Sequence, residues 1–202
     1  MVIITSWPKN VARTCVIDFD KTLIAIDSVR YIIWRERLFL RPEIFAWGCL
    51  CTCAVAFLPR SWQKPFRRRL KFYVLRYMDT HSSWILARYV PRLAGYLCRD
   101  LERCLRAQYA RRYIISASWE PLIKECLAQS GLDAGYIIRG TRYQPDFAQF
   151  NTWWYDEKLK VMRAEQLADF DLYTDSYDDQ PLMRPARHVF LVRRGKIHKQ
   201  LK

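Results

Sequence analysis

Short apolar runs alternate with longer stretches of helical spacing in the first and last parts of the chain. The run over 13–17 is apolar and ends in acidic residues, which is typical of a buried strand. Strands that alternate with helices indicate a parallel sheet. We therefore predict an α/β fold built on a doubly wound parallel sheet. Further strands are predicted over 113–115, 136–138, 141–143, 172–173 and 188–192, and helices over 119–130 and 156–168.

The middle of the chain, residues 28–112, has a different pattern. Apolar positions recur there at helical spacing, and glycine is rare. Serine and threonine can cap a helix N-terminus and proline suits its first turn, so these residues mark candidate helix starts. Helices are predicted from Ser28 through Leu38, from Pro42 to Leu58, from Ser61 to Tyr77, from Thr80 or Ser82, and over about 96–109.

Composition and charge narrow the class of protein. Of the 202 residues, 51% are hydrophobic, so a single domain with a modest insertion can bury a substantial core and a disordered chain is excluded. The formal net charge is +14, and residues 28–112 hold 18 Lys and Arg against 5 Asp and Glu. Because the flanking parts are nearly balanced, we predict that the helical middle is an insertion with an anionic partner of its own.

Seven cysteines are present, and no two of them form a CxxC pair. Cys49, Cys51 and Cys53 alternate inside an apolar run, where no His or acid could complete a metal site. We therefore expect buried thiols in a reducing compartment. The N-terminus lacks the charged region of a signal peptide, so a cytoplasmic protein is expected.

Polar residues follow the predicted strands at several points. Asp18–Thr22 comes directly after the first strand, Ser116–Ser118 after the second, and Asp175–Asp179 after the strand at 172–173. In an open parallel sheet, ligands bind at the carboxyl ends of the strands. These three clusters are expected to converge there, and Lys158, which opens a helix, could join them.

The chemistry that suits such a set is phosphoryl transfer. Asp18 can act as nucleophile or metal ligand, while Asp20 can donate and accept a proton. Carboxylates gathered at one point repel each other, so the cluster predicts a hard divalent cation, Mg²⁺, with Asp175 and Asp179 as further oxygen ligands. Donors for phosphoryl oxygens are available in Ser116 and Lys158.

In this order and spacing, the clusters resemble the four motifs of the haloacid dehalogenase superfamily. Ser-Ala-Ser at 116–118 and Asp-Ser-x-x-Asp-x-Pro-Leu at 175–182 resemble its IB branch, which is similar to phosphoserine phosphatase. The tail from Tyr173, followed by the basic-glycine turn 193–196, is similar to phosphatidylglycerophosphatase C-like bacterial phosphatases. The resemblance covers 10–27 and about 96–195, and it implies a phosphatase core formed by residues 1–27 and 96–202.

This resemblance also implies a role for each motif residue. Asp18 would form an aspartyl-phosphate, and Asp20 would protonate the leaving oxygen and then activate water. Asp179 would support either the metal waters or the lysine, and that choice stays open. The phosphate-binding set would be Ser116, Lys158 and Thr22, the last by orienting its loop, and the metal set would be Asp18, Asp20, Asp175 and Asp179. The motif departs from the family pattern at Thr174, where Gly is common, and leaves Lys160 as an alternative lysine.

A helical cap inserted after the first motif is a further implication, and residues 28–95 fit that place. Within it, Ile44–Leu58 is a run of 15 residues without a charge, shorter than the roughly 18–20 residues needed to cross a bilayer. Basic residues flank it on both sides, so a helix at the membrane interface fits better than one that crosses. The alternative is a cap helix buried in a helical bundle.

We therefore predict a Mg²⁺-dependent phosphomonoester hydrolase that acts on the terminal phosphate of a phospholipid, phosphatidylglycerophosphate by resemblance. One alternative is a phosphatase for soluble metabolites such as phosphoserine, and another is an inactive module that binds anions or membranes. No nucleic-acid recognition motif is present, so nucleic acid is not an expected partner. The expected location is the cytoplasm, with peripheral attachment to the inner face of the cell membrane as an option, and the oligomeric state stays open.

Overall fold

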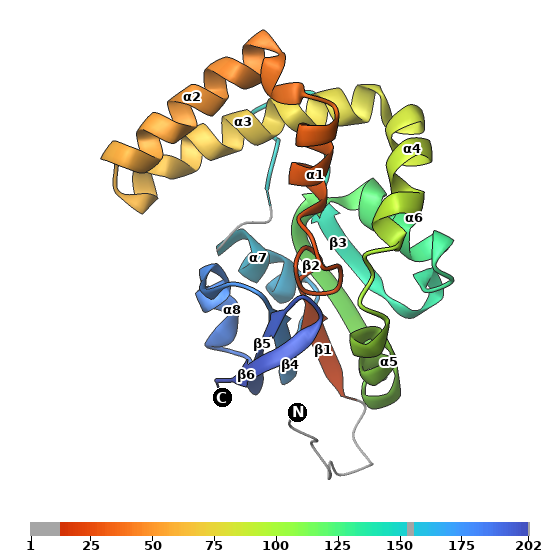
Figure 1. The fold of residues 1–202 in the computed structure, drawn as a ribbon. Coiled ribbons are helices and arrows are strands. Elements are labelled where there is room, and N and C mark those ends of the chain that lie inside the picture. Colours follow the sequence, from red (N-terminus) through yellow and green to blue (C-terminus); the bar gives the residue numbers. More distant parts are fainter. Residues whose placement is uncertain (1–12, 153–155, 202) are drawn as a thin grey trace.

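The computed structural model describes residues 13–152 and 156–201, whose six strands form one sheet in the order β3-β2-β1-β4-β5-β6 (Figure 1). The first five strands are parallel, and β6 runs antiparallel to β5. The chain starts in the middle of the sheet, builds one edge and returns to build the other, which confirms the predicted doubly wound arrangement. The strands are β1 (Thr14–Ile17), β2 (Arg111–Trp119), β3 (Ile137–Thr141), β4 (Phe170–Thr174), β5 (His188–Arg193) and β6 (Lys196–Gln200).

Both faces of the sheet are buried at its central strands, whereas the edge strand β6 is exposed. Successive side chains of a strand point to opposite faces, so Cys15 and Ile17 of β1 join one hydrophobic cluster and Val16 joins another. The first cluster is completed by the helices α5 (Arg99–Gln108) and α6 (Glu120–Gln129), the second by α7 (Asp156–Ala164) and α8 (Gln180–Met183). This burial explains why the strands appear in the sequence as continuous apolar runs.

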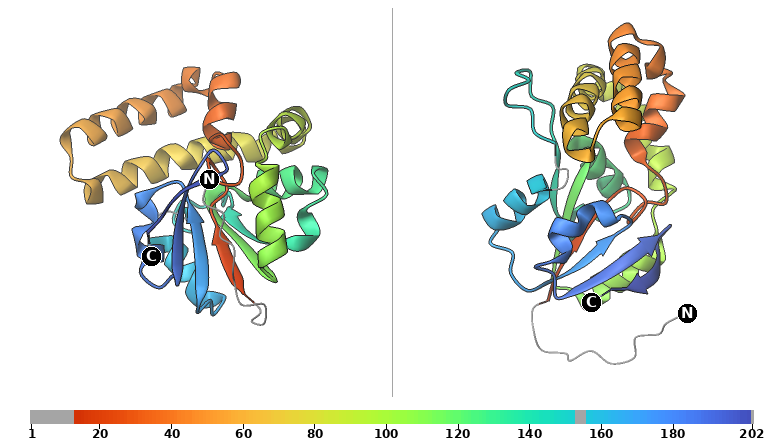
Figure 2. Two further views of the ribbon diagram at one scale, coloured as in Figure 1. Left: turned by 60° about the horizontal axis from the view of Figure 1, so that its bottom comes forward. Right: turned by 90° about the vertical axis from the view of Figure 1, so that its left-hand side faces the viewer.

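The helical middle of the chain lies over the carboxyl ends of the strands (Figures 1 and 2). The two segments that lead into and out of it lie side by side, because the Ala25 N–H donates to the Tyr96 carbonyl and the Cys98 N–H to the Leu23 carbonyl, both at 2.9 Å. The helices thus leave the core and return to it at one point. They are α1 (Ser28–Arg35), α2 (Pro42–Phe57), α3 (Arg60–Thr80) and α4 (Ser82–Ala94), with a short 3-10 turn at η1 (Leu38–Leu40). Two further 3-10 turns belong to the α/β part of the chain, η2 (Asp133–Gly135) between α6 and β3 and η3 (Tyr177–Asp179) between β4 and α8.

Several helix starts differ from the prediction. Pro42 occupies the first turn of α2 as expected, but Asp27 caps α1 in place of Ser28, because its carboxylate accepts from the Arg30 N–H at 2.9 Å. Neither Thr80 nor Ser82 caps α4, whose N-cap is His81. Helix α3 begins at Arg60, one residue before the predicted start, and α7 ends at Ala164, four residues before the predicted end. The segment 136–143 contains one strand where two were predicted, and the strand β6 was not predicted.

Helix α2 changes the expectation of buried thiols. It packs against α3 and buries the stripe Ile44, Cys51 and Ala54, whereas Cys49 and Cys53 are exposed, as is Cys104 on α5. The apolar residues of α2 lie all round the helix, but only one side of it is covered. Within the described residues, no helix combines the length and the apolar character needed to span a bilayer.

Candidate active site

The loop after β1 holds Asp18 at the carboxyl edge of the sheet. The Asp18 N–H donates to the Tyr173 carbonyl of β4 at 2.9 Å, and the Asp18 carboxylate accepts from the Phe19 N–H at 2.8 Å. Phe19 and Leu23 are fully buried and anchor the loop, while Lys21 takes a left-handed conformation with φ 58°. The chain therefore turns sharply here and leaves the Asp18 side chain facing a cavity.

A buried lysine lies opposite this carboxylate. Lys158 Nζ is 3.4 Å from Asp18 Oδ2 and 2.8 Å from Asp179 Oδ1, and the Thr174 hydroxyl donates to Asp179 Oδ2 at 2.8 Å. Burial alone would lower the pKa of Lys158, but the charges of Asp18 and Asp179 raise that pKa above its usual range. Both carboxylate oxygens of Asp179 thus have a partner. Asp179 was expected to support either the metal waters or the lysine, and the structure shows its contact with the lysine.

Lys160 takes no part in this cluster. Its side chain is exposed and pairs with Glu157 at 2.9 Å. The geometry therefore resolves the choice between the two lysines in favour of Lys158.

A chain of hydroxyl groups supports Asp20 and Asp18. The Ser28 N–H donates to Asp20 Oδ1 at 2.9 Å, and the Ser28 hydroxyl lies 2.7 Å from the Ser118 hydroxyl. Ser116 accepts from the Ser118 N–H at 3.2 Å, and its side chain lowers the pKa of Asp18, against the larger effect of burial. Burial, with the nearby charge of Asp27, raises the pKa of Asp20 to about 7. Asp20 is thus held beside the nucleophile candidate in an environment that favours its protonated form.

Thr22 lies outside this constellation. Its side chain is fully buried, its hydroxyl has no hydrogen-bond partner among the described residues, and it does not line the cavity. Thr22 therefore does not face the cavity, and its role in orienting the loop stays a prediction.

Lys71 of α3 is a site residue that the sequence analysis missed. Its ammonium donates to the Ala117 carbonyl, between the two serines of β2, and its side chain lines the same cavity as Asp18. Burial lowers the pKa of Lys71 to about 8, although the charges of Asp20, Asp27 and Asp18 oppose this. Lys71 lies in a run of basic residues, and only the packing of α3 over the core distinguishes it from its neighbours.

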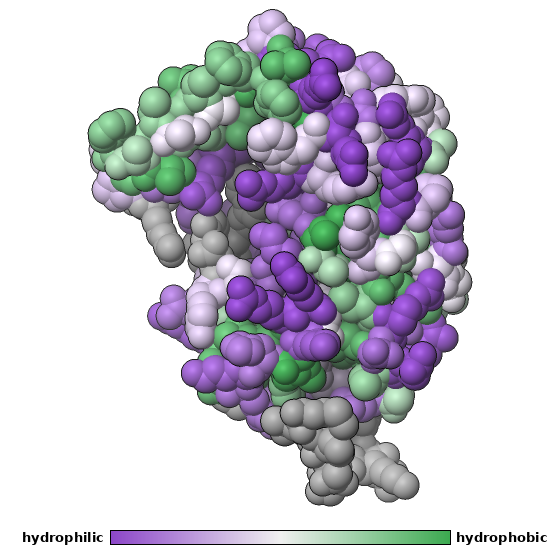
Figure 3. All heavy atoms as spheres, viewed as in Figure 1, coloured by the Kyte–Doolittle hydropathy of each residue, from purple (hydrophilic) through white to green (hydrophobic). Residues whose placement is uncertain are grey.

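The cavity joins the sheet edge to the underside of the helical layer and has a volume of about 900 Å³. The space-filling view shows the hollow below α2 and α3 (Figure 3). Among the described residues, equal numbers of acidic and basic side chains line it, so their formal charges cancel and a phosphate dianion could enter with a divalent cation without upsetting the balance. The acids are Asp18, Asp20, Asp27, Asp175 and Asp179, and the bases are Lys21, Arg30, Arg67, Lys71 and Lys158.

Two carboxylates are available for a cation. Burial and the charge of Asp18 raise the pKa of Asp175 to about 6, so these two groups repel each other across the cavity. Within residues 13–152 and 156–201, no three His, Cys, Asp or Glu side chains converge as a metal cluster. Mg²⁺, however, commonly takes only one or two carboxylates and completes its shell with water. The pair Asp18 and Asp175 therefore fits a single Mg²⁺ ion, whereas Asp179 is committed to Lys158.

Comparison with known proteins identifies the family. The family model of the haloacid dehalogenase-like hydrolases matches residues 15–184. The chain belongs to this family. The match confirms the resemblance drawn from the four motifs, and it makes the chain a hydrolase by family. No curated protein sequence matches the chain.

Solved structures share the fold of this haloacid dehalogenase-like hydrolase at low sequence identity. A protein of unknown function from Bordetella pertussis Tohama I has a TM-score of 0.59 at 12% identity, over 90% of each chain. A phosphoserine phosphohydrolase-like protein from Francisella tularensis subsp. tularensis SCHU S4 has a TM-score of 0.52 at 15% identity, over 89% of this chain and 86% of the other. A substrate-bound phosphoserine phosphatase has a TM-score of 0.51 at 14% identity, over 90% and 86%. At these identities the likenesses show a shared fold, and the phosphoserine-phosphatase-like branch stays a prediction.

Proposed function

We propose that this hydrolase is a Mg²⁺-dependent phosphomonoesterase that works through an aspartyl-phosphate on Asp18. We further propose that its substrate is a membrane phospholipid with a terminal phosphate, of the phosphatidylglycerophosphate type. The observation that carries the lipid substrate is the exposed apolar surface of α2, which lies on the same helical layer that covers the catalytic cavity. Helices α1 to α4, within residues 28–95, act in this proposal as a cap.

In the first step, an Asp18 carboxylate oxygen attacks the phosphorus and the bond from phosphorus to the leaving oxygen breaks. Asp20, in its protonated form, gives its proton to that oxygen, and the alcohol departs. Ser116 and Lys158 donate to the phosphoryl oxygens as charge builds up on them. Burial raises the pKa of Asp18, and the contact with Lys158 acts in the opposite direction by favouring the ionised nucleophile.

In the second step, the Asp20 carboxylate takes a proton from a water molecule, and the water oxygen attacks the phosphorus. The bond from phosphorus to Asp18 breaks, inorganic phosphate leaves, and both carboxyl groups return to their starting states. A Mg²⁺ ion held by Asp18, Asp175 and the Asp20 carbonyl would neutralise part of the phosphoryl charge. Asp179 holds Lys158 in place through both steps.

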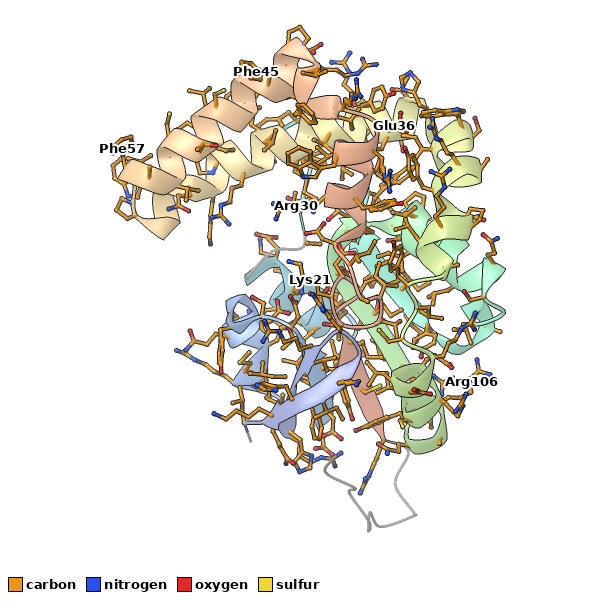
Figure 4. The ribbon with its side chains drawn as sticks, viewed as in Figure 1. Lys21, Arg30, Glu36, Phe45, Phe57 and Arg106 are labelled. Atoms are coloured by element: carbon orange, nitrogen blue, oxygen red, sulfur yellow. The ribbon has the colours of Figure 1, made fainter. Side chains whose placement is uncertain are left out.

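The lipid substrate is supported by the surface of α2. Phe45, Leu50 and Phe57 are exposed to 59%, 45% and 83%, and Trp62 at the start of α3 to 67%. Figure 4 shows Phe45 and Phe57 toward the two ends of α2, and Figure 3 shows a continuous apolar surface over this helix. A contiguous apolar patch of this kind on a monomer marks an interaction site.

The charges around this patch favour an anionic lipid surface over a neutral partner. Arg35, Arg37 and Arg41 are exposed before α2, and Lys64 is exposed after it. Each Lys or Arg near an anionic membrane contributes about 1 kcal/mol of attraction. An apolar helix with basic flanks can lie in the membrane interface with its exposed side in the acyl boundary.

The decisive experiment combines vesicle flotation with phosphate release. Wild-type protein should float with anionic vesicles at low salt and release phosphate from phosphatidylglycerophosphate in them faster than from phosphoserine. Replacing Phe45 and Phe57 with Ser should move the protein to the bottom of the gradient and reduce lipid turnover, while turnover of p-nitrophenyl phosphate changes little. Ile197→Ser is a matched control, because Ile197 is exposed to 45% on β6.

The same experiment identifies the alternatives. Wild-type protein that stays at the bottom of the gradient and hydrolyses phosphoserine faster than the lipid would show a phosphatase for soluble metabolites. Flotation without turnover of any phosphomonoester would show an inactive membrane-binding module.

A further inference from the structure

The roof of the catalytic cavity is formed by matching faces of two helices. Gly48, Cys51, Thr52 and Val55 of α2 line it, and Arg67, Leu70, Lys71 and Val74 of α3 do the same. Both sets follow the spacing i, i+3, i+4, i+7, which is one face of an α-helix. Two antiparallel helices therefore present one continuous stripe each to the space above Asp18.

The roof and the floor of the cavity differ in chemistry. The floor carries the carboxylates, serines and Lys158 of the core, whereas most of the side chains that the cap contributes are apolar. We name this upper part the apolar chamber and define it by Ile33 of α1, Phe39 of η1, Cys51 and Val55 of α2, and Leu70 and Val74 of α3. A charged group bound to the core residues of the cavity thus lies next to the apolar chamber, which offers few polar side chains.

The volume of the cavity exceeds what a small phosphomonoester needs. Its 900 Å³ corresponds to about thirty water molecules at about 30 Å³ each. A metabolite of the size of phosphoserine, with about ten non-hydrogen atoms, would leave most of the space to water against apolar walls, which is unfavourable. A leaving group with a long apolar part would fill it.

The chamber also opens toward the outside. Trp34 and Val55 line the cavity and are nevertheless exposed to 60% and 52%. Val55 belongs to α2, the helix whose outer side forms the exposed apolar patch. Val55 thus belongs both to the lining of the cavity and to the exposed side of α2, so the cavity opens beside the apolar patch.

We propose that the apolar chamber is a binding site for one alkyl or acyl chain of the substrate, which it holds while the terminal phosphate lies on Asp18. The proposal rests on the proposed function and extends it from the phosphate end of the lipid to its chain. Arg67 lies one turn before Lys71 on the same face of α3 and suits an anionic group of the substrate that lies between the chain and the terminal phosphate.

Gly48 offers a way to fill the chamber without disturbing the fold. It lines the cavity, and a Cβ at this position would meet no other atom within 4 Å. Glycine is also a poor helix former, so a larger residue here favours α2. The side chains introduced by Gly48→Leu and Gly48→Trp should thus fill the chamber to a smaller and a larger extent. Cys49→Trp adds the same bulk one position later, at an exposed residue outside the cavity lining.

The test measures binding of n-alkylphosphonates with two to ten carbons to the full chain by calorimetry, below their micelle concentrations. These probes cannot be hydrolysed, so the result does not depend on turnover. The dissociation constant of the wild type should fall by up to about fourfold per methylene until the chamber is full. This decrease of the dissociation constant with chain length should be smaller in Gly48→Leu, nearly absent in Gly48→Trp, and the same as in the wild type in Cys49→Trp. Thermal unfolding confirms that each variant is folded.

Two results would overturn the proposal. One is equal affinity of the wild type for ethyl- and decylphosphonate, and the other is a steep series that persists in Gly48→Trp, which would place the chain on the outer surface of α2. The proposed function fails separately, if the protein releases no phosphate from any phosphomonoester. A steep series that Gly48→Trp abolishes would support the chamber even in that case.

Discussion

Replacing Lys71 with methionine tests whether a cation supplied by the cap acts on the phosphate. Methionine keeps a similar length but removes the ammonium, which lines the cavity and donates to the Ala117 carbonyl. The carbonyl is not left without a partner, because the Thr141 hydroxyl also donates to it at 2.7 Å. The variant also removes a charge that burial disfavours, so we expect the free energy of unfolding to change by less than about 1 kcal/mol.

The expected loss of activity is much larger than the change in stability. A hydrogen bond from a charged donor is worth about 1.5–3 kcal/mol, which corresponds to about a 10- to 150-fold decrease in kcat/KM for p-nitrophenyl phosphate. Because burial lowers the pKa of Lys71 to about 8, the wild-type kcat/KM should also fall as the pH rises through 8. The methionine variant should lack this alkaline limb near pH 8 and keep only the fall near pH 7 that comes from the loss of the Asp20 proton.

Two further variants separate charge from packing. Lys71→Arg keeps the charge and should retain more activity than Lys71→Met, with the alkaline limb shifted beyond pH 10. Lys64→Met removes an exposed lysine of the same helix that does not line the cavity, and it should change kcat/KM by less than about twofold. Wild-type kcat/KM and an unchanged pH profile in Lys71→Met would refute the assignment of Lys71 to the site.

Three other predictions follow from the geometry. Asp18→Asn should reduce phosphate release to background, because an amide cannot form the acyl-phosphate; turnover close to that of the wild type would contradict the mechanism. EDTA should abolish phosphate release, Mg²⁺ should restore it, and Ca²⁺ should restore little because its coordination is larger and looser; full activity after exhaustive chelation would exclude the metal. Asp171→Ala should lower the free energy of unfolding in urea by about 3–5 kcal/mol, because it removes the buried acceptor of Tyr109, Arg187 and His188. Burial raises the pKa of Asp171, but these hydrogen bonds lower it below its usual value, so its stabilisation should be present above about pH 3.9 and lost as the pH falls further; equal stability of variant and wild type at pH 7 would contradict this.

Much of the core of this hydrolase could be predicted from the sequence. Apolar runs predict buried parallel strands, because a parallel sheet is covered on both faces. The polar clusters that follow these runs mark the carboxyl ends of the strands, where such a sheet binds ligands. The observed register agrees, since Ile17 lies beside Ile114 of β2 and Tyr173 of β4. Asp18 and Asp175 therefore come together as expected.

Other features depend on which face of an element is covered. Residues two apart on a helix point in nearly opposite directions, so the packing of α7 alone decides that Lys158 is buried at the site and Lys160 is exposed. In the same way, Lys71 enters the cavity only because that face of α3 lies over the core.

The exposure of α2 is decided in the tertiary structure for a related reason. In an amphipathic helix, the spacing of the apolar residues indicates which side is buried. The apolar residues of α2 lie all round the helix, so their spacing indicates no particular side. Its position against α3 covers Ile44, Cys51 and Ala54 and leaves Phe45 and Phe57 exposed. The sequence by itself therefore determined the sheet, the order of the motifs and the chemistry they serve. Tertiary packing decided which lysines reach the cavity and which apolar side chains face outward, because the helical pattern alone does not say which face of the helix a neighbour covers.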